Sequence, residues 1–338
     1  MRRTKQRIGA PGLFSVVIIG ALLLSPTGAA QNQPAAPTPQ ISFTAQVAKT
    51  VASITAYYTE AGATHSTSGT CFFVFIPDER IGKSGYFKYL VTNRHVATAL
   101  GMPQSEIVPL VDLRVNLTHP QGQDGAADIR IPLTGNMHWY FPSDSTVDLA
   151  VLPGAPSPES VDMKAIPISI LATNDILKSQ TVDLGDPVFF VGYFFQFPGL
   201  HRADPIYRNG AIAMMPTDPI LMRAEGNDKP ISEHLYLADA HAFLGNSGSP
   251  LFVNLGGFRN GVVTAGGSPY YLLGVVNGFI PESADGNVMA ATLEQGVKEN
   301  LHSSGVLTFV PAQELWDFLY SPVLKHQRDE VAASTQKK

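Results

Sequence analysis

Apolar residues along this chain gather in short runs that are bounded by glycine, proline, asparagine or aspartate. Many short strands separated by such turn residues are typical of an all-β sandwich or barrel. We expect strands at residues 51–58, 69–76, 89–92, 107–117, 128–131, 149–152, 165–168, 187–192, 212–214, 235–239, 250–253, 271–278 and 306–311. Strands do not alternate with helices, which argues against a parallel α/β sheet.

One helix is predicted near the C-terminus. Pro311 suits the start of a helix, because its missing N–H would have no partner there. Leu315, Phe318 and Leu319 follow at helical spacing and predict one buried face. We expect this helix to pack against the strands. Residues 198–233 and 281–304 are rich in proline or polar residues and are predicted to be long loops.

The first thirty residues have the pattern of a signal peptide. A basic start precedes an apolar run at residues 13–24, which is shorter than the roughly 20 residues of a membrane span. Small residues up to Ala30 offer a cleavage site, so we expect export to the periplasm or the extracellular space. An uncleaved membrane anchor is the alternative. Residues 31–40 read as a flexible linker, and residues 323–338 as a disordered tail.

Charge and cysteine content narrow the function classes. The 338-residue chain has a formal net charge of −5, and loss of the basic start makes the remainder more acidic. This balance argues against a nucleic acid or an acidic membrane surface as the partner. Cys71 is the single cysteine and lies in an apolar run, so we expect a buried core residue and no internal disulfide.

A serine between glycines marks the strongest candidate for chemistry. Residues 245–250 read Gly-Asn-Ser-Gly-Ser-Pro and precede an apolar strand. A glycine at position 245 lets its N–H approach a reacting carbonyl closely. The N–H groups of Gly245 and Ser247 are therefore the predicted oxyanion hole. Ser249 is the competing nucleophile, but only Ser247 has a glycine two residues before it.

A histidine and an acid precede that serine in the chain. His95 ends the apolar strand that begins near residue 89, and Asp148 opens the apolar strand 149–152. A serine hydroxyl needs a nearby base, and the base needs an orienting partner. We assign Ser247 as nucleophile, His95 as general base and acid, and Asp148 as the orienting carboxylate. Asp144 is a competing acid, although it lies in a polar run.

The order His, Asp, Ser and the motifs around the three residues resemble the trypsin-like (chymotrypsin-fold) serine proteases. The chain is most similar to the protease domain of the bacterial high-temperature-requirement (Deg-type) family. The resemblance implies two six-stranded antiparallel β-barrels, placed at residues 41–160 and 161–322, with the cleft between them. It also implies an acyl-enzyme mechanism without a metal or a cofactor. Ser249 stands where the family has glycine, and we expect no PDZ domain, because few residues follow Leu319.

The resemblance also suggests where a substrate lies. His241 is at the position that forms the floor of the P1 pocket, and a peptide would pair with the edge at Val276, Asn277 and Gly278. His241 supplies no fixed negative charge, so we expect small or medium apolar P1 residues, or acidic ones if the ring is protonated. A structural histidine and a glycine that merely ends a buried strand are the alternatives.

The sequence therefore predicts an exported serine endopeptidase that acts on proteins or peptides. A weak or inactive binding protein on the same scaffold is the alternative, although such proteins usually lack one of the three groups. An esterase is less consistent with the order of the three residues and with a serine at position 249. Nothing in the chain indicates an oligomeric state.

Overall fold

A computed structural model describes residues 42–60, 62–98, 107–121, 123–135, 137–154, 156, 159–195, 197, 199–222, 230–259, 262–264, 270–282, 290–292 and 302–335. The predicted signal peptide (1–30) and linker (31–40) lie outside these residues. Residues 1–40 and 41–338 are separate units, and the fold below is that of the second. None of the helices in the described ranges is long and apolar enough to cross a membrane.

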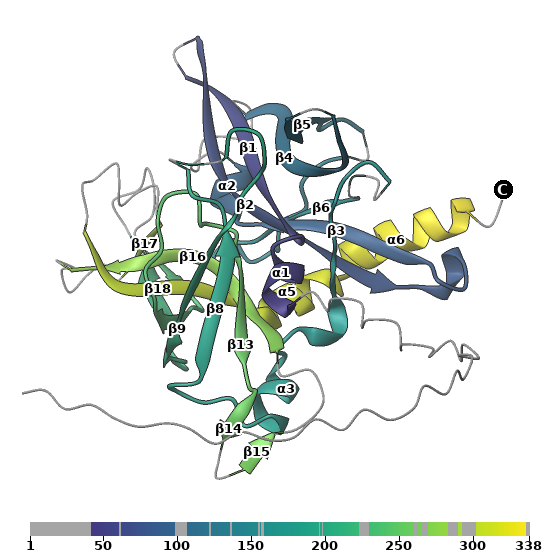
Figure 1. Ribbon diagram of the computed structural model, residues 1–338. Coiled ribbons are helices and arrows are strands. Elements are labelled where there is room, and N and C mark those ends of the chain that lie inside the picture. Colours follow the sequence, from purple (N-terminus) through teal and green to yellow (C-terminus); the bar gives the residue numbers. More distant parts are fainter. Residues whose placement is uncertain are drawn as a thin grey trace, which may run out of the picture. The chain divides into compact units, whose positions relative to one another are not determined.

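The first half of the fold is one antiparallel sheet (Figure 1). Its strands follow the order β5-β4-β1-β2-β3-β6, and the short β7 pairs with β2 in parallel. The strands are β1 (Val51–Glu60), β2 (Ala63–Pro77), β3 (Tyr86–Thr92), β4 (Ile107–Gln121), β5 (Asp124–Pro132), β6 (Ala150–Pro153) and β7 (Ile166–Pro167).

The second half is a closed six-stranded barrel. Its strands pair in the order β13-β8-β9-β12-β18-β16, and pairing of β16 with β13 completes the ring, while β17 adds to β16 outside it. The strands are β8 (Pro187–Gly192), β9 (Ile206–Met214), β12 (Tyr236–Asp239), β13 (Pro250–Asn254), β16 (Tyr270–Pro281), β17 (Ala291–Thr292) and β18 (Ser303–Pro311).

Of the two closed barrels expected, the described residues show one, in the second half. Within the described ranges, the end strands β5 and β6 do not pair with each other. The outer edge of β6 is instead bonded to Tyr140, whose N–H and carbonyl both reach Val151 at 2.8 and 2.9 Å. Near one end of β4, Leu117 forms a bridge to Val161. Loop residues therefore bond to backbone groups at the outer edge of β6 and on β4.

Alternation along the strands separates three clusters of buried side chains. On β2, Cys71 and Phe73 face the core of the first sheet, and Phe72 and Val74 face a shared cluster. On β13, the barrel core takes Leu251 and Val253, whereas Phe252 belongs to the shared cluster. The shared cluster thus packs the two halves together. Burial raises the pKa of the Cys71 thiol, which fits a core role.

Short elements complete the fold. The two expected loops contain strands: β9 and the hairpin β10–β11 lie within the first, and β17 lies within the second. The remaining elements are α1 (Phe43–Val47), η1 (Glu79–Ile81), α2 (Arg94–Ala97), η3 (Ile168–Ile170), α3 (Asn174–Ser179), β10 (Ile220–Met222), β11 (Ile231–Glu233), β14 (Gly257–Arg259), β15 (Val262–Thr264), α5 (Ala312–Leu319) and α6 (Pro322–Thr335). Helix α5 confirms the helix predicted after Pro311, with Leu315, Phe318 and Leu319 buried.

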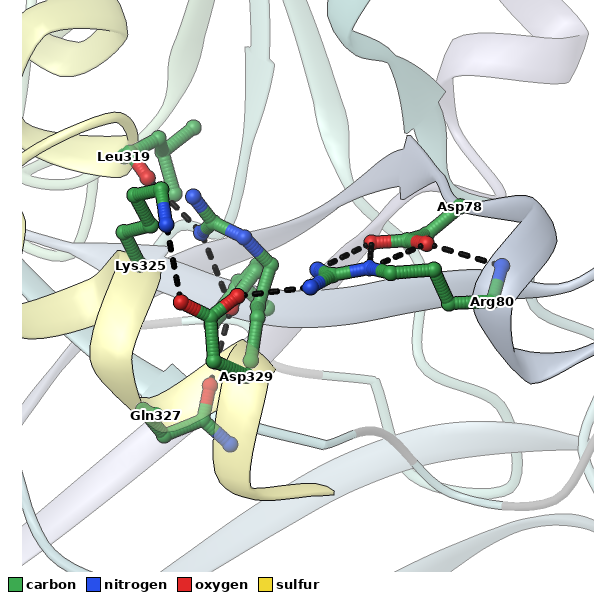
Figure 2. A network of polar contacts seen from close by, with 8 residues as sticks. Asp78, Arg80, Leu319, Lys325, Gln327 and Asp329 are labelled. Atoms are coloured by element: carbon green, nitrogen blue, oxygen red, sulfur yellow. Dashed lines mark hydrogen bonds and ion pairs between the residues drawn. The ribbon is translucent and has the colours of Figure 1, made fainter. Parts of the chain in front are cut away.

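The expected disordered tail at 323–338 is instead largely helix α6. Arg328 is 4 % exposed, and its guanidinium donates to the Leu319 carbonyl at 2.8 Å and to the Tyr89 hydroxyl at 3.2 Å. Figure 2 shows the neighbouring ion pairs, in which Arg80 contacts both Asp78 and Asp329 at 2.7 Å. The buried guanidinium of Arg328, through its bond to Tyr89 of β3, ties α6 to the first sheet.

Candidate active site

His95 and Asp148 are brought together by strand pairing. β3 pairs with β6 so that Thr92 lies opposite Ala150, which places the residues just after β3 beside those just before β6. His95 lies in the first turn of α2. Its backbone N–H donates to Asp148 Oδ1 at 3.0 Å, and its ring Nδ1 lies 2.6 Å from Asp148 Oδ2. The carboxylate therefore holds the histidine at two points.

Electrostatics at this pair favour an ionised acid. Burial pushes the pKa of Asp148 upward, but the His95 ring and the two hydrogen bonds from His95 hold the pKa below its ordinary value. An ionised carboxylate can only accept, so Nδ1 carries the proton and Nε2 is the basic nitrogen. The competing acid Asp144 is exposed and accepts hydrogen bonds from the N–H and hydroxyl of Thr146.

Ser247 lies in a tightly bonded turn between β12 and β13. Asn246 braces the turn, because its side chain accepts from the Phe243 N–H and donates to the Tyr193 carbonyl, both at 2.8 Å. Gly245 and Gly248 have φ angles of +97° and +84°, a region that favours glycine. A side chain at 245 would meet the backbone at Phe195 and Tyr193. Local sequence thus fixes the shape of the turn.

Thr70 of β2 joins this turn to the first sheet. Its hydroxyl donates to the Gly245 carbonyl at 2.7 Å and accepts from the Tyr193 N–H at 2.8 Å. Its own N–H donates to the Ser247 carbonyl at 2.8 Å. Because all these groups are buried, the bonds form a fixed link between the two halves at the candidate site.

The carbonyls around Gly245 point to protein partners. The Leu244 carbonyl accepts from the Phe195 N–H at 3.1 Å, and the Gly245 carbonyl accepts from Thr70. Among the described residues, none accepts a hydrogen bond from the Gly245 N–H. This arrangement leaves that N–H available as a donor to a developing oxyanion.

Asn277 of β16 connects the serine to the acid. Its side-chain Nδ2 donates to Asp148 Oδ2 at 2.9 Å, and its backbone carbonyl accepts from Ser247 Oγ at 3.3 Å. Asn277 and Ser247 are fully buried. The structure thus brings His95 and Asp148 into direct contact. Asn277 lies between Ser247 and Asp148 and is bonded to both. The sequence indicated Asn277 as part of a substrate edge but gave no sign of its contact with the acid.

The other predicted substrate residues have different surroundings. His241 is exposed and lies beside Gly305 of β18, where a side chain would come within 3.2 Å of the ring. Val276 is buried and bonded to Gly248 and Ser249, each at 2.9 Å. Gly278 is buried and pairs with Thr292 of β17, so the edge predicted to be open is occupied.

Ser249, the competing serine, lies against Gly192 of β8. It is fully buried, and a side chain at Gly192 would overlap its hydroxyl. The absent side chain at Gly192 therefore provides the space that the serine hydroxymethyl takes.

A second buried carboxyl was not foreseen from sequence. Glu233 ends β11, is 5 % exposed, and accepts a long hydrogen bond of 3.4 Å from Asn277 Nδ2. Burial raises its pKa well above the ordinary value, and the negative charge of Asp148 raises it further. Its neighbourhood read as a polar loop, so the sequence offered no signal for this position.

No family model matches the chain, and no curated protein matches it. A solved structure described as an HtrA-type protease with a decapeptide is similar in fold, with 16% sequence identity and a TM-score of 0.41. The alignment covers 81% of this chain and 64% of that chain.

Proposed function

We propose that this chain is a serine endopeptidase that hydrolyses peptide bonds through an acyl-enzyme. The observation that carries the proposal is the two-point contact between His95 and Asp148, with Asn277 bonded to both Asp148 and Ser247. A carboxylate that orients an imidazole next to a serine is the arrangement that activates a hydroxyl. The glycine turn supports the same role for Ser247.

The proposed reaction proceeds in two stages. Ser247 Oγ attacks the peptide carbonyl carbon while its proton passes to His95 Nε2. The N–H groups of Gly245 and Ser247 bind the resulting oxyanion. Collapse releases the amine, which takes the proton from His95, and leaves an ester on Ser247. Water then attacks this ester with His95 again as base, and the acid is released.

Asp148 stays ionised throughout these steps, because its pKa lies below the ordinary value. It stabilises the imidazolium that forms after each proton transfer. The chemistry requires no metal or cofactor. Within the described ranges, no group of three or more histidine, cysteine or acidic side chains could hold a metal ion.

Substrates are proposed to be extended peptides that pair with β16 at Asn277 and Gly278, as an added strand would, because the Val276 backbone is already bonded to Gly248 and Ser249. His241 and Gly305 would lie near the P1 side chain. Cleavage after small, medium apolar or acidic residues is the expected preference. Profiling with a peptide library tests it, and strong cleavage after arginine or lysine would refute it. Export is proposed from the N-terminal pattern alone.

A fluorophosphonate probe tests the proposed function. Such probes react with activated serines, so we expect labelling of the wild-type protein and none of the S247A variant. The reaction should be followed over hours, because Ser247 is fully buried. Equal labelling of both proteins, or none after prolonged incubation together with no hydrolysis of casein, would favour the binding-protein alternative.

A further inference from the structure

Strand β17 occupies the edge at which a peptide substrate would pair. Gly278 and Phe279 of β16 lie opposite Thr292 and Ala291 in antiparallel register. Both β16 residues and Ala291 are buried. A strand edge offers each backbone donor and acceptor to one neighbour at a time. A peptide can therefore use this edge only after β17 has left it.

The hairpin β10–β11 is joined to β17. Ile220, Leu221 and Met222 pair with residues 231–233 in antiparallel register. Ala290, directly before β17, forms a parallel bridge with Met222, and its N–H donates to the Leu221 carbonyl at 3.0 Å. Met222 and Ala290 are almost fully buried. We call β10, β11 and residues 290–292 the cover.

Glu233 anchors the cover at the candidate catalytic residues. Asn277 Nδ2 donates to Asp148 at 2.9 Å and also reaches Glu233 at 3.4 Å, so one amide bridges two carboxyl groups. The charged groups that act on Glu233 are Asp148, His95 and Arg94. The next residue, His234, is exposed and acts instead on Asp144 and Glu314.

We propose that the cover is an intramolecular inhibitor, which occupies the peptide-pairing edge of β16 in the resting state and is fastened at Glu233. The proposal rests on the proposed endopeptidase function and adds its regulation. A tethered strand competes at a high effective concentration, of the order of millimolar for a short link. Weakly binding peptides are excluded, and a substrate or partner that pairs more strongly with β16 displaces the cover.

A disulfide across the two strands tests this proposal. Directly opposed residues in an antiparallel pair have Cα atoms about 4.5–5.5 Å apart, within the range that a disulfide spans. Phe279 and Ala291 are such a pair. The F279C/A291C variant should therefore cross-link on oxidation. Hydrolysis of fluorescein-labelled casein should then be at least about tenfold slower than in the reduced form of the same protein, and reductant should restore it.

The wild type with and without reductant is the control, since its single thiol, Cys71, is buried. A second variant, A291P, removes one N–H from β17 and should speed hydrolysis several-fold. Equal casein hydrolysis in the oxidised and reduced forms, or failure of the cross-link to form, would overturn the proposal that the cover inhibits. Fluorophosphonate labelling of the wild type would in that case still support the proposed enzyme. Absence of labelling and hydrolysis in every variant, A291P included, would overturn both proposals.

Discussion

The candidate catalytic cluster and the cover are built in different ways. Cluster contacts join residues far apart in the chain through short bonds, such as those of His95 to Asp148 and of Thr70 to Gly245. The cover consists of strands of two or three residues, and its described link to the catalytic residues is the 3.4 Å bond at Glu233. The cluster is thus held by several short bonds, whereas the described part of the cover reaches it through one long bond.

The cluster concerns the proposed chemical step, whereas the cover concerns the access of a peptide to β16. Groups that stabilise a transition state act best when they are already in position. Elements that move in regulation come from the parts of a fold with low local stability. On this account His95 and Asp148 are already paired, and activity depends on whether β17 leaves β16. Each variant below alters one part of the molecule and leaves the others intact.

The largest effect is expected from the nucleophile. The S247A variant should lose casein hydrolysis by roughly 10⁴-fold or more, because no hydroxyl remains to form the acyl-enzyme. S249A is the matched control, since Ser249 is equally buried and lies two residues away. It should keep activity within a few-fold. The opposite pattern would transfer the role of nucleophile to Ser249.

A large effect is also expected from T70V, which keeps the shape of the side chain but removes two hydrogen bonds of the turn. Displacement of catalytic groups by about 1 Å can cost roughly 10²-fold in rate. The buried Gly245 carbonyl and Tyr193 N–H would lose a partner, which should lower the free energy of unfolding by about 2 kcal/mol.

Urea denaturation and casein hydrolysis measure both consequences of T70V. The matched control is T55V, because the Thr55 hydroxyl contacts Ser68 at 3.0 Å in the same sheet and is half-buried. It should leave the rate unchanged. A T70V protein with the wild-type rate would show that the turn is not held through this hydroxyl.

A smaller, pH-dependent effect is expected from E233Q. Burial and Asp148 raise the pKa of Glu233 in the covered state, so the covered state binds the proton more tightly than an open one. The protonated carboxyl of Glu233 therefore favours closure of the cover fully at pH values below the ordinary carboxyl pKa. This contribution is lost as the pH rises through the raised pKa of Glu233 in the covered state. Glutamine does not titrate and should keep the cover closed at every pH.

The ratio of wild-type to E233Q kcat/KM for casein should thus rise several-fold between about pH 5 and pH 9. E314Q is the matched control, because burial also raises the pKa of Glu314, which lies outside the cover. A ratio that stays constant with pH would show that ionisation of Glu233 does not affect closure of the cover.

The smallest effect on activity is expected from R328M in α6. Loss of its bonds to Leu319 and Tyr89 should lower the free energy of unfolding by about 1–3 kcal/mol, with kcat unchanged. R80Q removes exposed ion pairs and should leave the urea midpoint near that of the wild type. A loss of kcat in R328M would mean that α6 affects the site.

The sequence predicted those features that depend on local pattern. Strand ends mark the positions of His95 and Asp148, and the glycine turn marks Ser247. Helix α5 has a clear apolar face, whereas α6 was missed because its buried stripe is formed by Leu324, Arg328 and Ala332, with an arginine in the centre. A buried arginine has no signature in a hydrophobicity pattern.

Other features depend on contacts between distant segments. A strand of two residues, such as β17, has no periodicity to detect. The burial of Glu233 follows from its meeting with Asn277, which local sequence does not encode. The bonding of Tyr140 with Val151 at the outer edge of β6 is a similar non-local contact.

The central claim is that His95 activates Ser247. Peptide mass mapping of the fluorophosphonate adduct in the wild type and in H95Q tests it most directly. The account predicts an adduct on the peptide that contains Ser247 in the wild type, and at most a trace in H95Q. An adduct on another residue, or equal labelling of Ser247 in both proteins, would contradict it.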